Sequence, residues 1–318
     1  MEARFLERAL ELAEHGRGTT HPNPVVGAVA VVGDEIVGEG WHARKGGPHA
    51  EVVALEAAGG RARGATVYVT LEPCAHHGTT PPCVDALLAA GVARVVAGQR
   101  DPHPEHGSGL DRLAESGVDV ELAKDELGFR CRQQIEEWRT WVSTGRPFVT
   151  YKVAVTLDGR VRVPRTRWVT GEDARRLVHV LRAQSDAVAV GMGTVRWDNP
   201  RLDARDVQVQ RQPRRIAFGR GPLPDDSELE LHPGPLREEL EQLATEGVQS
   251  LLLEGGPTLA AAFVEAGLVD KFLVFTAPRI SGDGPGMLEG LPRPLELTRM
   301  EARPVGGDVL IQAYLNEP

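Results

Sequence analysis

The first half of the chain alternates between two hydrophobic periods. Apolar side chains at helical spacing over residues 5–13 predict an N-terminal helix. The apolar run at 25–32 stops at Gly33-Asp34 and resumes at 36–37, which is typical of a β-hairpin. Further runs predict strands at 67–71, 92–97 and 118–122 and helices at 49–58 and 83–90. This alternation indicates an α/β domain with helices on both faces of one sheet.

A second series of strands and helices follows Gly145-Arg146-Pro147, which we interpret as the joint between two domains. Residues 148–155 have strong β propensity and predict its first strand, and the last strand is expected at 309–311. We expect the segments 207–213 and 219–235 to be surface connections inside this second domain. Length also favours two domains, because 318 residues exceed one ordinary core.

Composition narrows the class of protein. Apolar residues make up 41% and charged residues 25% of the chain, as in soluble globular proteins. We find no apolar run near 18 residues and no basic-then-apolar start, so we expect no membrane span, no secretory signal and a cytoplasmic protein. The net charge of −9 and the dispersed Arg residues argue against nucleic acid and favour a small substrate.

The pattern His49-Ala50-Glu51, then Pro73-Cys74 and Pro82-Cys83, is that of a hydrolytic zinc site. One imidazole and two thiolates hold Zn²⁺, while Glu51 is expected to move protons to and from the reacting groups. The two Cys are nine residues apart instead of three, and turn-forming residues fill the interval. The alternative, two buried free thiols and a surface His, is disfavoured because all parts occur together in the expected order.

Other residues allow simpler interpretations. Cys131, the third Cys, has no partner for a disulfide outside the zinc site and is expected to be a structural thiol. A strand at 251–253 stops at Gly255-Gly256 and a helix follows, so backbone N–H groups there could approach a phosphate. The same pattern is common as plain turn chemistry, and Lys152 would ordinarily be a solvated strand charge. Spacing alone therefore leaves a nucleotide site open.

The chain resembles the bifunctional deaminase/reductases of riboflavin biosynthesis over nearly its whole length. The similar segments of the deaminase half are 20–27, 42, 49–51, 70–78 and 80–83, and those of the reductase half are 157–160, 168–171, 181–183, 193–195, 198–200 and 254–257. The nine-residue Cys spacing is this family's own. Two matched halves in the expected order make coincidence implausible.

This resemblance implies a cytidine-deaminase-like α/β/α domain at 1–145, dependent on zinc, and a dihydrofolate-reductase-like α/β domain at 146–318, dependent on NADPH. It also implies two consecutive reactions. The 2-amino group of a diaminopyrimidinone ribosylamino phosphate is hydrolysed to a carbonyl, and the ribosyl group is then reduced to ribityl. We expect this small molecule as the partner, with no nucleic acid and no membrane, and a homo-oligomeric protein.

The resemblance also implies roles for individual residues. In the deaminase half, His49, Cys74 and Cys83 hold zinc, Glu51 transfers protons and Asn23 recognises the base, since its amide both donates and accepts. For substrate contact in this half it implies His42 and His76, for which a local turn or cap role is the alternative.

In the reductase half the resemblance implies a catalytic role for Lys152 near the reacting carbon. The residues implied for NADPH are Ala154, Trp168, Thr194, Asp198, Gly256, Pro257 and Thr258. Those implied for the substrate are Thr166, Arg182, Leu202, Arg205 and Glu254. Arg182 and Arg205 suit a phosphate, because guanidinium binds phosphate with a planar fork.

The chain departs from the family pattern at three places. His103 replaces the usual Asn in a segment 101–104 whose following loop is one residue short, the loop 161–167 is shorter and more basic, and Gly219 replaces an Asp. The altered loop 161–167 leaves the alternative of a deaminase with a non-catalytic C-terminal domain. A further alternative, from a different class, is a nucleic-acid-editing deaminase, which the acidic balance disfavours.

Overall fold

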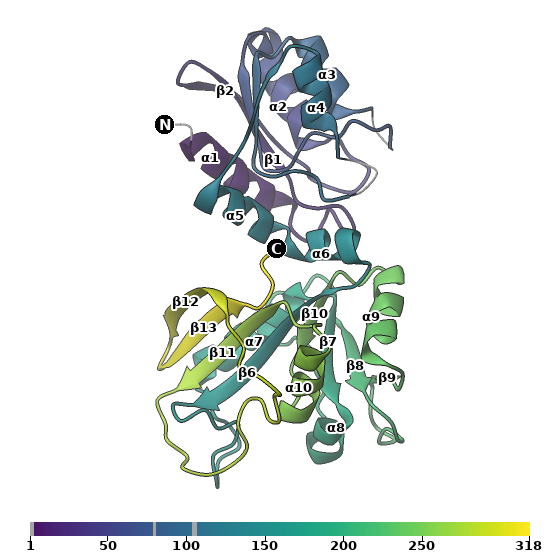
Figure 1. The fold of residues 1–318 in the computed structure, drawn as a ribbon, viewed down its shortest axis with the longest axis vertical. Coiled ribbons are helices and arrows are strands. Elements are labelled where there is room, and N and C mark those ends of the chain that lie inside the picture. Colours follow the sequence, from purple (N-terminus) through teal and green to yellow (C-terminus); the bar gives the residue numbers. More distant parts are fainter. Residues whose placement is uncertain (1–2, 79–80, 104–106) are drawn as a thin grey trace. The chain divides into compact units, whose positions relative to one another are not determined.

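The chain forms two compact units (Figure 1). The first extends to Thr144 and includes Pro318, and the second runs from Gly145 to Glu317. The structure is a computed structural model that describes residues 3–78, 81–103 and 107–318. Within these ranges, no helix has both the length and the apolar character that crossing a bilayer requires.

The first unit is built on one mixed sheet in the order β2-β1-β3-β4-β5. Its strands are β1 (Gly27–Val32), β2 (Glu35–Trp41), β3 (Thr66–Val69), β4 (Arg94–Ala97) and β5 (Asp119–Leu122). β1 is antiparallel to both β2 and β3, while β3, β4 and β5 are parallel to one another. The predicted hairpin at 25–37 is thereby confirmed.

Helices cover both faces of this sheet, as the alternation of elements predicts (Figure 1). Ala28, Val67 and Val95 point to one face, whereas their neighbours Val29 and Tyr68 point to the other, because side chains alternate along a strand. The first face packs against α2 (Ala50–Ala58), α3 (Cys83–Ala90) and α4 (Gly109–Glu115). The second packs against α1 (Ala3–Ala13) and α5 (Asp125–Gln134), and the remaining helical segments are η1 (Glu14–Gly16), η2 (Gly59–Ala62) and α6 (Glu136–Thr144).

The second unit contains an eight-stranded sheet in the order β12-β13-β11-β6-β10-β7-β8-β9. Its strands are β6 (Phe148–Thr156), β7 (Ala187–Gly191), β8 (Arg214–Phe218), β9 (Glu230–His232), β10 (Ser250–Leu253), β11 (Lys271–Ala277), β12 (Thr298–Val305) and β13 (Asp308–Tyr314). The six strands from β11 to β9 in this order are parallel, and β13 and β12 extend the sheet antiparallel. The carboxyl ends of β6, β10 and β7 therefore lie at one edge.

Four helices bury the two faces of the second sheet. α9 (Leu236–Thr245) and α10 (Pro257–Glu265) pack against one face through Leu240 and Phe263. α7 (Glu172–Gln184) and α8 (Met192–Asp198) supply Val178 and Val195 to the cores on the other. The unit is thus a second three-layer α/β fold.

Several elements differ from the pattern-based prediction. The segment 219–235, expected to be a surface connection, contains the edge strand β9, which has only three residues and therefore little periodicity to detect. The helices α4, α5, α6 and α9 and the strands β11 and β12 have no counterpart in the prediction. In α5 and α6, polar residues dilute the apolar spacing. Cys131 on α5 is buried in the core, and burial raises the pKa of its thiol to about 12, as expected of a structural thiol.

Candidate metal centre and active sites

His49 is the N-cap residue of α2, with φ −75° and ψ 161°, and its carbonyl oxygen accepts a hydrogen bond from the Val53 N–H at 3.2 Å. The imidazole therefore lies at the helix N-terminus, one residue before the turn in which the helical spacing predicts it. Glu51 is the second residue of the helix and is buried. One short segment thus positions two different chemical groups.

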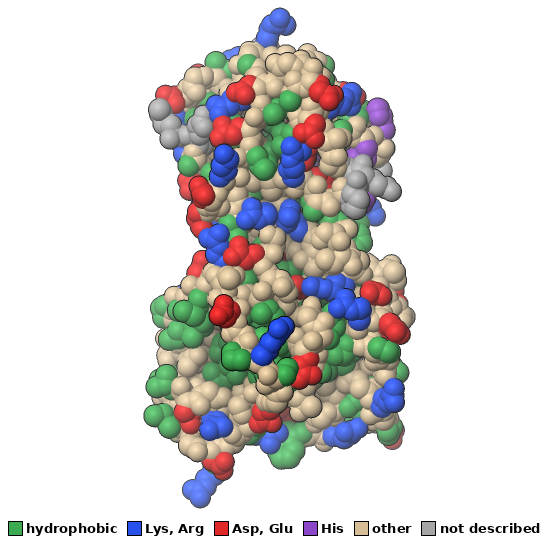
Figure 2. Space-filling view, viewed as in Figure 1, with side chains coloured by type: hydrophobic (Ala, Val, Ile, Leu, Met, Phe, Trp, Pro, Cys, Tyr) green, Lys and Arg blue, Asp and Glu red, His purple; other side chains and the backbone are tan. Residues whose placement is uncertain are grey.

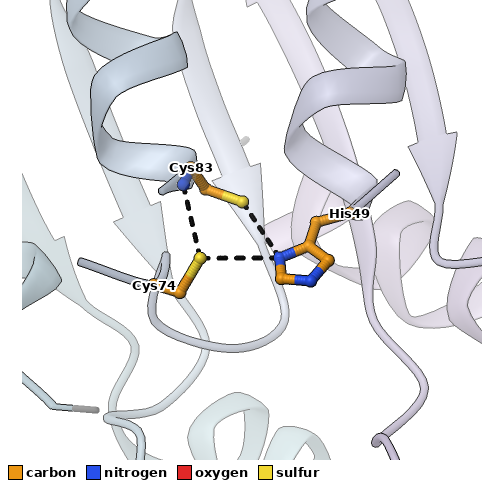
Figure 3. A group of neighbouring side chains, drawn as sticks. All are labelled: His49, Cys74 and Cys83. Carbon is orange, nitrogen blue, oxygen red and sulfur yellow. Dashed lines mark hydrogen bonds between the residues drawn. The ribbon is translucent and has the colours of Figure 1, made fainter. Parts of the chain in front are cut away.

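Cys74 and Cys83 flank the insert 75–82, one at each end, and both side chains point toward His49 (Figure 3). Cys83 is the first residue of α3, and its backbone N–H donates to Cys74 Sγ at 3.3 Å. His49 Nδ1 lies 3.2 Å from Cys83 Sγ and 3.5 Å from Cys74 Sγ. Zn–S bonds of about 2.3 Å and Zn–N bonds of about 2.0 Å place tetrahedral ligands about 3.6 Å apart. The three atoms fit a single zinc ion.

The charge state of the two thiols also fits a cation. Hydrogen bonds from the Cys83 side chain, from His49 and from the Cys83 backbone lower the pKa of Cys74 to about 4, against the opposing effect of burial. The hydrogen bond to Cys74 and burial raise the pKa of Cys83. Only one of two adjacent sulfurs ionises readily, because a second negative charge would lie beside the first. A divalent cation offsets this repulsion and favours two thiolates.

Glu51 adjoins the His49, Cys74 and Cys83 set but is not part of it. Burial raises the pKa of its carboxyl to about 7, His49 lowers it and Cys74 raises it further. A carboxyl that titrates near neutral pH can accept and release a proton under working conditions. The geometry therefore separates three metal-ligand candidates from one buried carboxyl group that titrates near neutral pH.

Asn23 and His42 lie beside each other near the ends of β1 and β2. Asn23 Nδ2 is 3.2 Å from His42 Nε2, and His42 Nδ1 is 3.0 Å from the carbonyl oxygen of Pro48. The His42 ring is buried and packs edge-on against His49, with 5.3 Å between ring centroids. Both His42 nitrogens thus have protein partners, whereas Asn23 is partly exposed.

His76 is half-buried in the insert between the two Cys. It shares its environment with Asp101 and His103, since burial raises the pKa of Asp101 while His103 and His76 lower it. The His103 N–H donates to Asp101 Oδ1 at 2.8 Å, and the His103 carbonyl oxygen accepts from the Gly107 N–H at 3.3 Å. Thr80 of the insert and Pro104 of the altered loop lie outside the described residues.

Sequence reasoning missed Glu72, which directly precedes Pro73-Cys74. Its side chain is fully buried and accepts the backbone N–H groups of Asp101 at 3.0 Å and Leu110 at 2.9 Å. These two bonds hold the loop after β4 and the start of α4 against the Cys74 segment. The signal in the sequence that could have identified Glu72 is an acidic residue between the apolar strand residues and Pro73-Cys74.

In the second unit, Lys152, Arg182 and Glu254 form one buried ion cluster. Arg182 Nε and Nη2 contact the two Glu254 oxygens at 2.6 and 3.1 Å, and Lys152 Nζ lies 3.3 Å from Oε2. Burial alone would raise the pKa of Glu254, but Lys152 and Arg182 lower it to about 2. Lys152 therefore has a fixed ammonium position on the central strand β6 and does not behave as a solvated strand charge.

Arg205 lies on a loop whose backbone is bound from two sides. The Gln212 side chain accepts from the Ala204 N–H at 2.9 Å and donates to the Ala204 carbonyl at 2.8 Å, in the manner of a neighbouring strand. The Arg205 N–H donates to His179 Nδ1 at 3.4 Å, and its side chain pairs with Asp203 at 2.6 Å. Sequence reasoning missed both Gln212 and His179, and Gln212 lies in a segment expected to be a plain surface connection.

Two other residues expected at the substrate lie differently. Leu202 has φ 53° and is only 1% exposed, so it belongs to the core. Thr166 is exposed in the loop 161–167, where its hydroxyl donates to the Val163 carbonyl at 3.3 Å.

The residues expected for the cofactor lie near the carboxyl edge of the second sheet. Thr194 and Asp198 belong to α8, which follows β7, and Gly256 is the N-cap of α10, which follows β10. A Cβ added to Gly256 would lie 3.7 Å from Thr194 Oγ1, so the starts of the two helices adjoin. Open α/β sheets bind their ligands at this edge.

Pro257 and Thr258 open the first turn of α10, where backbone N–H groups have no helical partner and can meet a phosphate. Ala154 lies on β6 two residues beyond Lys152, so the two side chains share one face of the sheet. Trp168 precedes α7 and is 48% exposed, with the guanidinium groups of Arg167 and Arg175 over its ring.

Comparison with known families agrees with this division. Residues 1–99 match the cytidine and deoxycytidylate deaminase zinc-binding region, and residues 147–311 match the RibD C-terminal domain. The fold and the sites thus define a two-domain enzyme that joins a zinc-binding deaminase to a reductase.

Relatives match over almost the full chain. The riboflavin biosynthesis protein RibD of Escherichia coli K12 is 41% identical, with 96% of this chain and 97% of the relative covered. RibD of Aquifex aeolicus is 35% identical, with 98% of each covered. The solved structure of Acinetobacter baumannii RibD, form 1, superposes with a TM-score of 0.85 at 33% identity and 98% coverage of both chains. The chain belongs to the RibD family, and it is a bifunctional deaminase and reductase that uses zinc and NADPH.

Proposed function

We propose that this enzyme acts on 2,5-diamino-6-(5-phosphoribosylamino)pyrimidin-4-one, replacing the 2-amino group by a carbonyl and then reducing the ribosyl side chain to ribityl. A Thermotoga maritima structure with a TM-score of 0.82 and 33% identity is a diaminohydroxyphosphoribosylaminopyrimidine deaminase/5-amino-6-(5-phosphoribosylamino)uracil reductase. The observation that carries the proposal is the convergence of His49, Cys74 and Cys83 with Glu51 beside them. We assign the deaminase to residues 1–145 and the reductase to 146–318.

In the deaminase domain, His49, Cys74 and Cys83 hold zinc, which supplies a bound water of lowered pKa. Glu51 accepts a proton and delivers it to the departing amino group, a role that its pKa near 7 supports. Asn23 binds the pyrimidine edge, and His76 lies in the same domain as a further substrate contact. The hydrolysis consumes water and releases ammonia.

In the reductase domain, the starts of α8 and α10 bind NADPH, which supplies hydride. We assign this role to Thr194, Asp198, Gly256, Pro257 and Thr258, together with Ala154 and Trp168. The fixed ammonium of Lys152 assists at the reacting carbon of the sugar. We assign Arg205 to the substrate phosphate, and Arg182, Glu254, Thr166 and Leu202 to the rest of the substrate site.

The ion cluster around Glu254 favours a working reductase over a deaminase with a non-catalytic C-terminal domain. A buried group of three charges is costly unless its geometry is good, and here each charge has a partner within 3.3 Å. A nucleic-acid editor is disfavoured because basic and acidic side chains are interspersed on the face shown in Figure 2. The chain's net charge of −9 points the same way.

The test is a coupled assay with the diaminopyrimidine phosphate, NADPH and zinc-replete protein that follows ammonia and NADPH together. Glu51→Gln should lower ammonia release about a hundredfold or more, since general acid–base groups contribute that much. Lys152→Ala should lower NADPH oxidation and leave ammonia release unchanged. Ammonia without NADPH oxidation in the wild type would refute the reductase half.

We also propose a cytoplasmic homo-oligomer. None of the three Cys, all of which the structure describes, forms a disulfide, which suits a reducing compartment. The edge strand β12 is exposed along nearly its whole length, with Met300 73% exposed, which suits contact with a second copy. Light scattering coupled to size exclusion would measure the assembly, and a monomeric mass would refute it.

A further inference from the structure

His42 contains a ring whose two nitrogens are fixed by different partners. Its Nδ1 lies 3.0 Å from the carbonyl oxygen of Pro48, and its Nε2 lies 3.2 Å from Asn23 Nδ2. A carbonyl oxygen can only accept, so Nδ1 must be the protonated nitrogen. In the neutral ring Nε2 is then an acceptor, and its partner on Asn23 must donate.

This chain of hydrogen bonds decides the orientation of the Asn23 amide. An amide has a donating and an accepting end that are otherwise interchangeable. Because the Asn23 Nδ2 group donates one of its N–H bonds to His42, Oδ1 and the second N–H remain available to another partner. Asn23 is also held from its backbone, since its N–H donates to the Thr20 carbonyl at 2.9 Å. The donating and accepting ends of the Asn23 amide therefore have one fixed orientation.

We propose that His42 is a positioning residue that sets the polarity of Asn23, so that Oδ1 accepts a hydrogen bond from an N–H group of the substrate ring. The ligand class is an aminopyrimidine edge that presents an N–H donor. This inference rests on the proposed deaminase function. His42 acts through Asn23 and makes no substrate contact through its ring nitrogens.

A merely structural role makes a different prediction. His42 packs against the His49 ring and hydrogen-bonds to Pro48, which directly precedes His49. His42 could therefore instead support His49 as a zinc ligand. Such support would be measured as zinc content. Polarity control would be measured as substrate affinity, with the metal unchanged.

Two partial replacements separate the two ring nitrogens. In His42→Asn, the side-chain amide can still donate to Pro48 but no longer reaches Asn23. In His42→Gln, the longer side chain offers an oxygen near the position of Nε2. We expect His42→Asn to raise the KM for the diaminopyrimidine about tenfold, since one hydrogen bond that orients a ligand group is lost. His42→Gln should raise it about threefold or less.

A double-mutant cycle tests whether the effect passes through Asn23. The further change Asn23→Ala should raise KM by itself and should reduce the effect of His42→Asn to less than about twofold. Zinc content by elemental analysis and NADPH oxidation with the deaminated pyrimidine should match wild type in every variant. Affinity of the diaminopyrimidine, measured by calorimetry in a Glu51→Gln background, should follow the same order as KM.

Three results would overturn the inference. These are an unchanged KM in His42→Asn, an effect of His42→Asn that persists undiminished without Asn23, or a loss of zinc that accounts for the change. Wild-type protein that releases no ammonia from the diaminopyrimidine would instead refute the proposed function itself. The two failures are therefore distinct.

Discussion

Two buried carboxyl groups, Glu51 and Glu254, have pKa values moved in opposite directions. Burial raises the pKa of Glu51 to about 7, whereas Lys152 and Arg182 overcome the effect of burial at Glu254 and lower its pKa to about 2. Glu51 can therefore exchange protons near neutral pH, and Glu254 remains ionised and holds two cations. The neighbours of a residue decide its role more than its chemical type does.

We expect Glu254→Gln to destabilise the second unit by about 3 to 5 kcal/mol at pH 7, because Lys152 and Arg182 lose the charge that compensates them. The pKa of Glu254 is lower in the folded protein, so its stabilisation is present above pH 4.5 and is lost as the pH falls toward 2. The melting temperature of wild type should thus approach that of the variant over this window.

The matched control is Glu246→Gln. The Glu246 carboxyl also pairs with an arginine, Arg214, but at the surface, so its loss should change stability by less than about 1 kcal/mol. Equal melting temperatures for the Glu254 and Glu246 variants at pH 7 would contradict the argument.

At the scale of elements, the groups of the deaminase site lie at the ends of strands and helices. His49 caps α2, Cys83 opens α3, and His42 directly follows β2. The segment of Cys74 is held in turn by α4, whose first residue is Gly109. A small shift of α2, α3 or α4 would therefore move one of the candidate zinc-ligand side chains.

Gly109→Ala is expected to disturb the zinc site. A Cβ at this position would lie 1.8 Å from the Pro73 carbonyl oxygen, next to Cys74, so α4 or the Cys74 segment must shift. We expect a loss of about 1 to 3 kcal/mol in stability and a lower zinc content after dialysis. Gly60→Ala is the control, since a Cβ there meets nothing within 4 Å. Wild-type zinc retention in Gly109→Ala would refute this reasoning.

Gln212→Leu should loosen the loop that carries Arg205. The substitution removes both hydrogen bonds to Ala204 while keeping a side chain of similar size. We expect the KM of the reductase step to rise about fivefold to tenfold, with kcat less affected, because binding groups lose their position before chemistry begins. Steady-state NADPH oxidation measures this. The deaminase step, whose residues lie in the other unit, is the internal control and should be unchanged.

At the scale of the whole molecule, each unit has its own sheet, core and chemical site. The three zinc-ligand candidates all lie in the first unit, and the cluster of Lys152, Arg182 and Glu254 lies wholly in the second. The two activities should therefore be separable by an agent that acts on one unit alone.

Removal of the metal by a chelator is expected to abolish ammonia release while leaving NADPH oxidation with the deaminated pyrimidine within about twofold of its starting rate. Structural and catalytic zinc sites stabilise the fold that holds them, so the melting temperature of the first unit should fall as well. Added zinc should restore both. Parallel loss of the reductase activity would show that the units depend on one another.

The sequence by itself determined the types of several elements and the candidate set of metal ligands. The period of apolar residues is a local property, so the hairpin, the strand β6 and the helices that begin near His49 and Cys83 followed from it. The order of His49, Glu51, Cys74 and Cys83 was equally readable, because each part sits in a short segment.

Tertiary structure alone decided which distant groups meet. Glu72 binds Leu110, His42 binds Asn23, Gln212 binds Ala204, and Arg182 reaches Glu254 72 residues along the chain. The three-residue strand β9 likewise exists because β8 pairs with it. Such contacts depend on the order of strands within a sheet, which brings side chains far apart in the sequence next to one another. No local pattern encodes them, because their free energy arises only when the sheet brings the partners together.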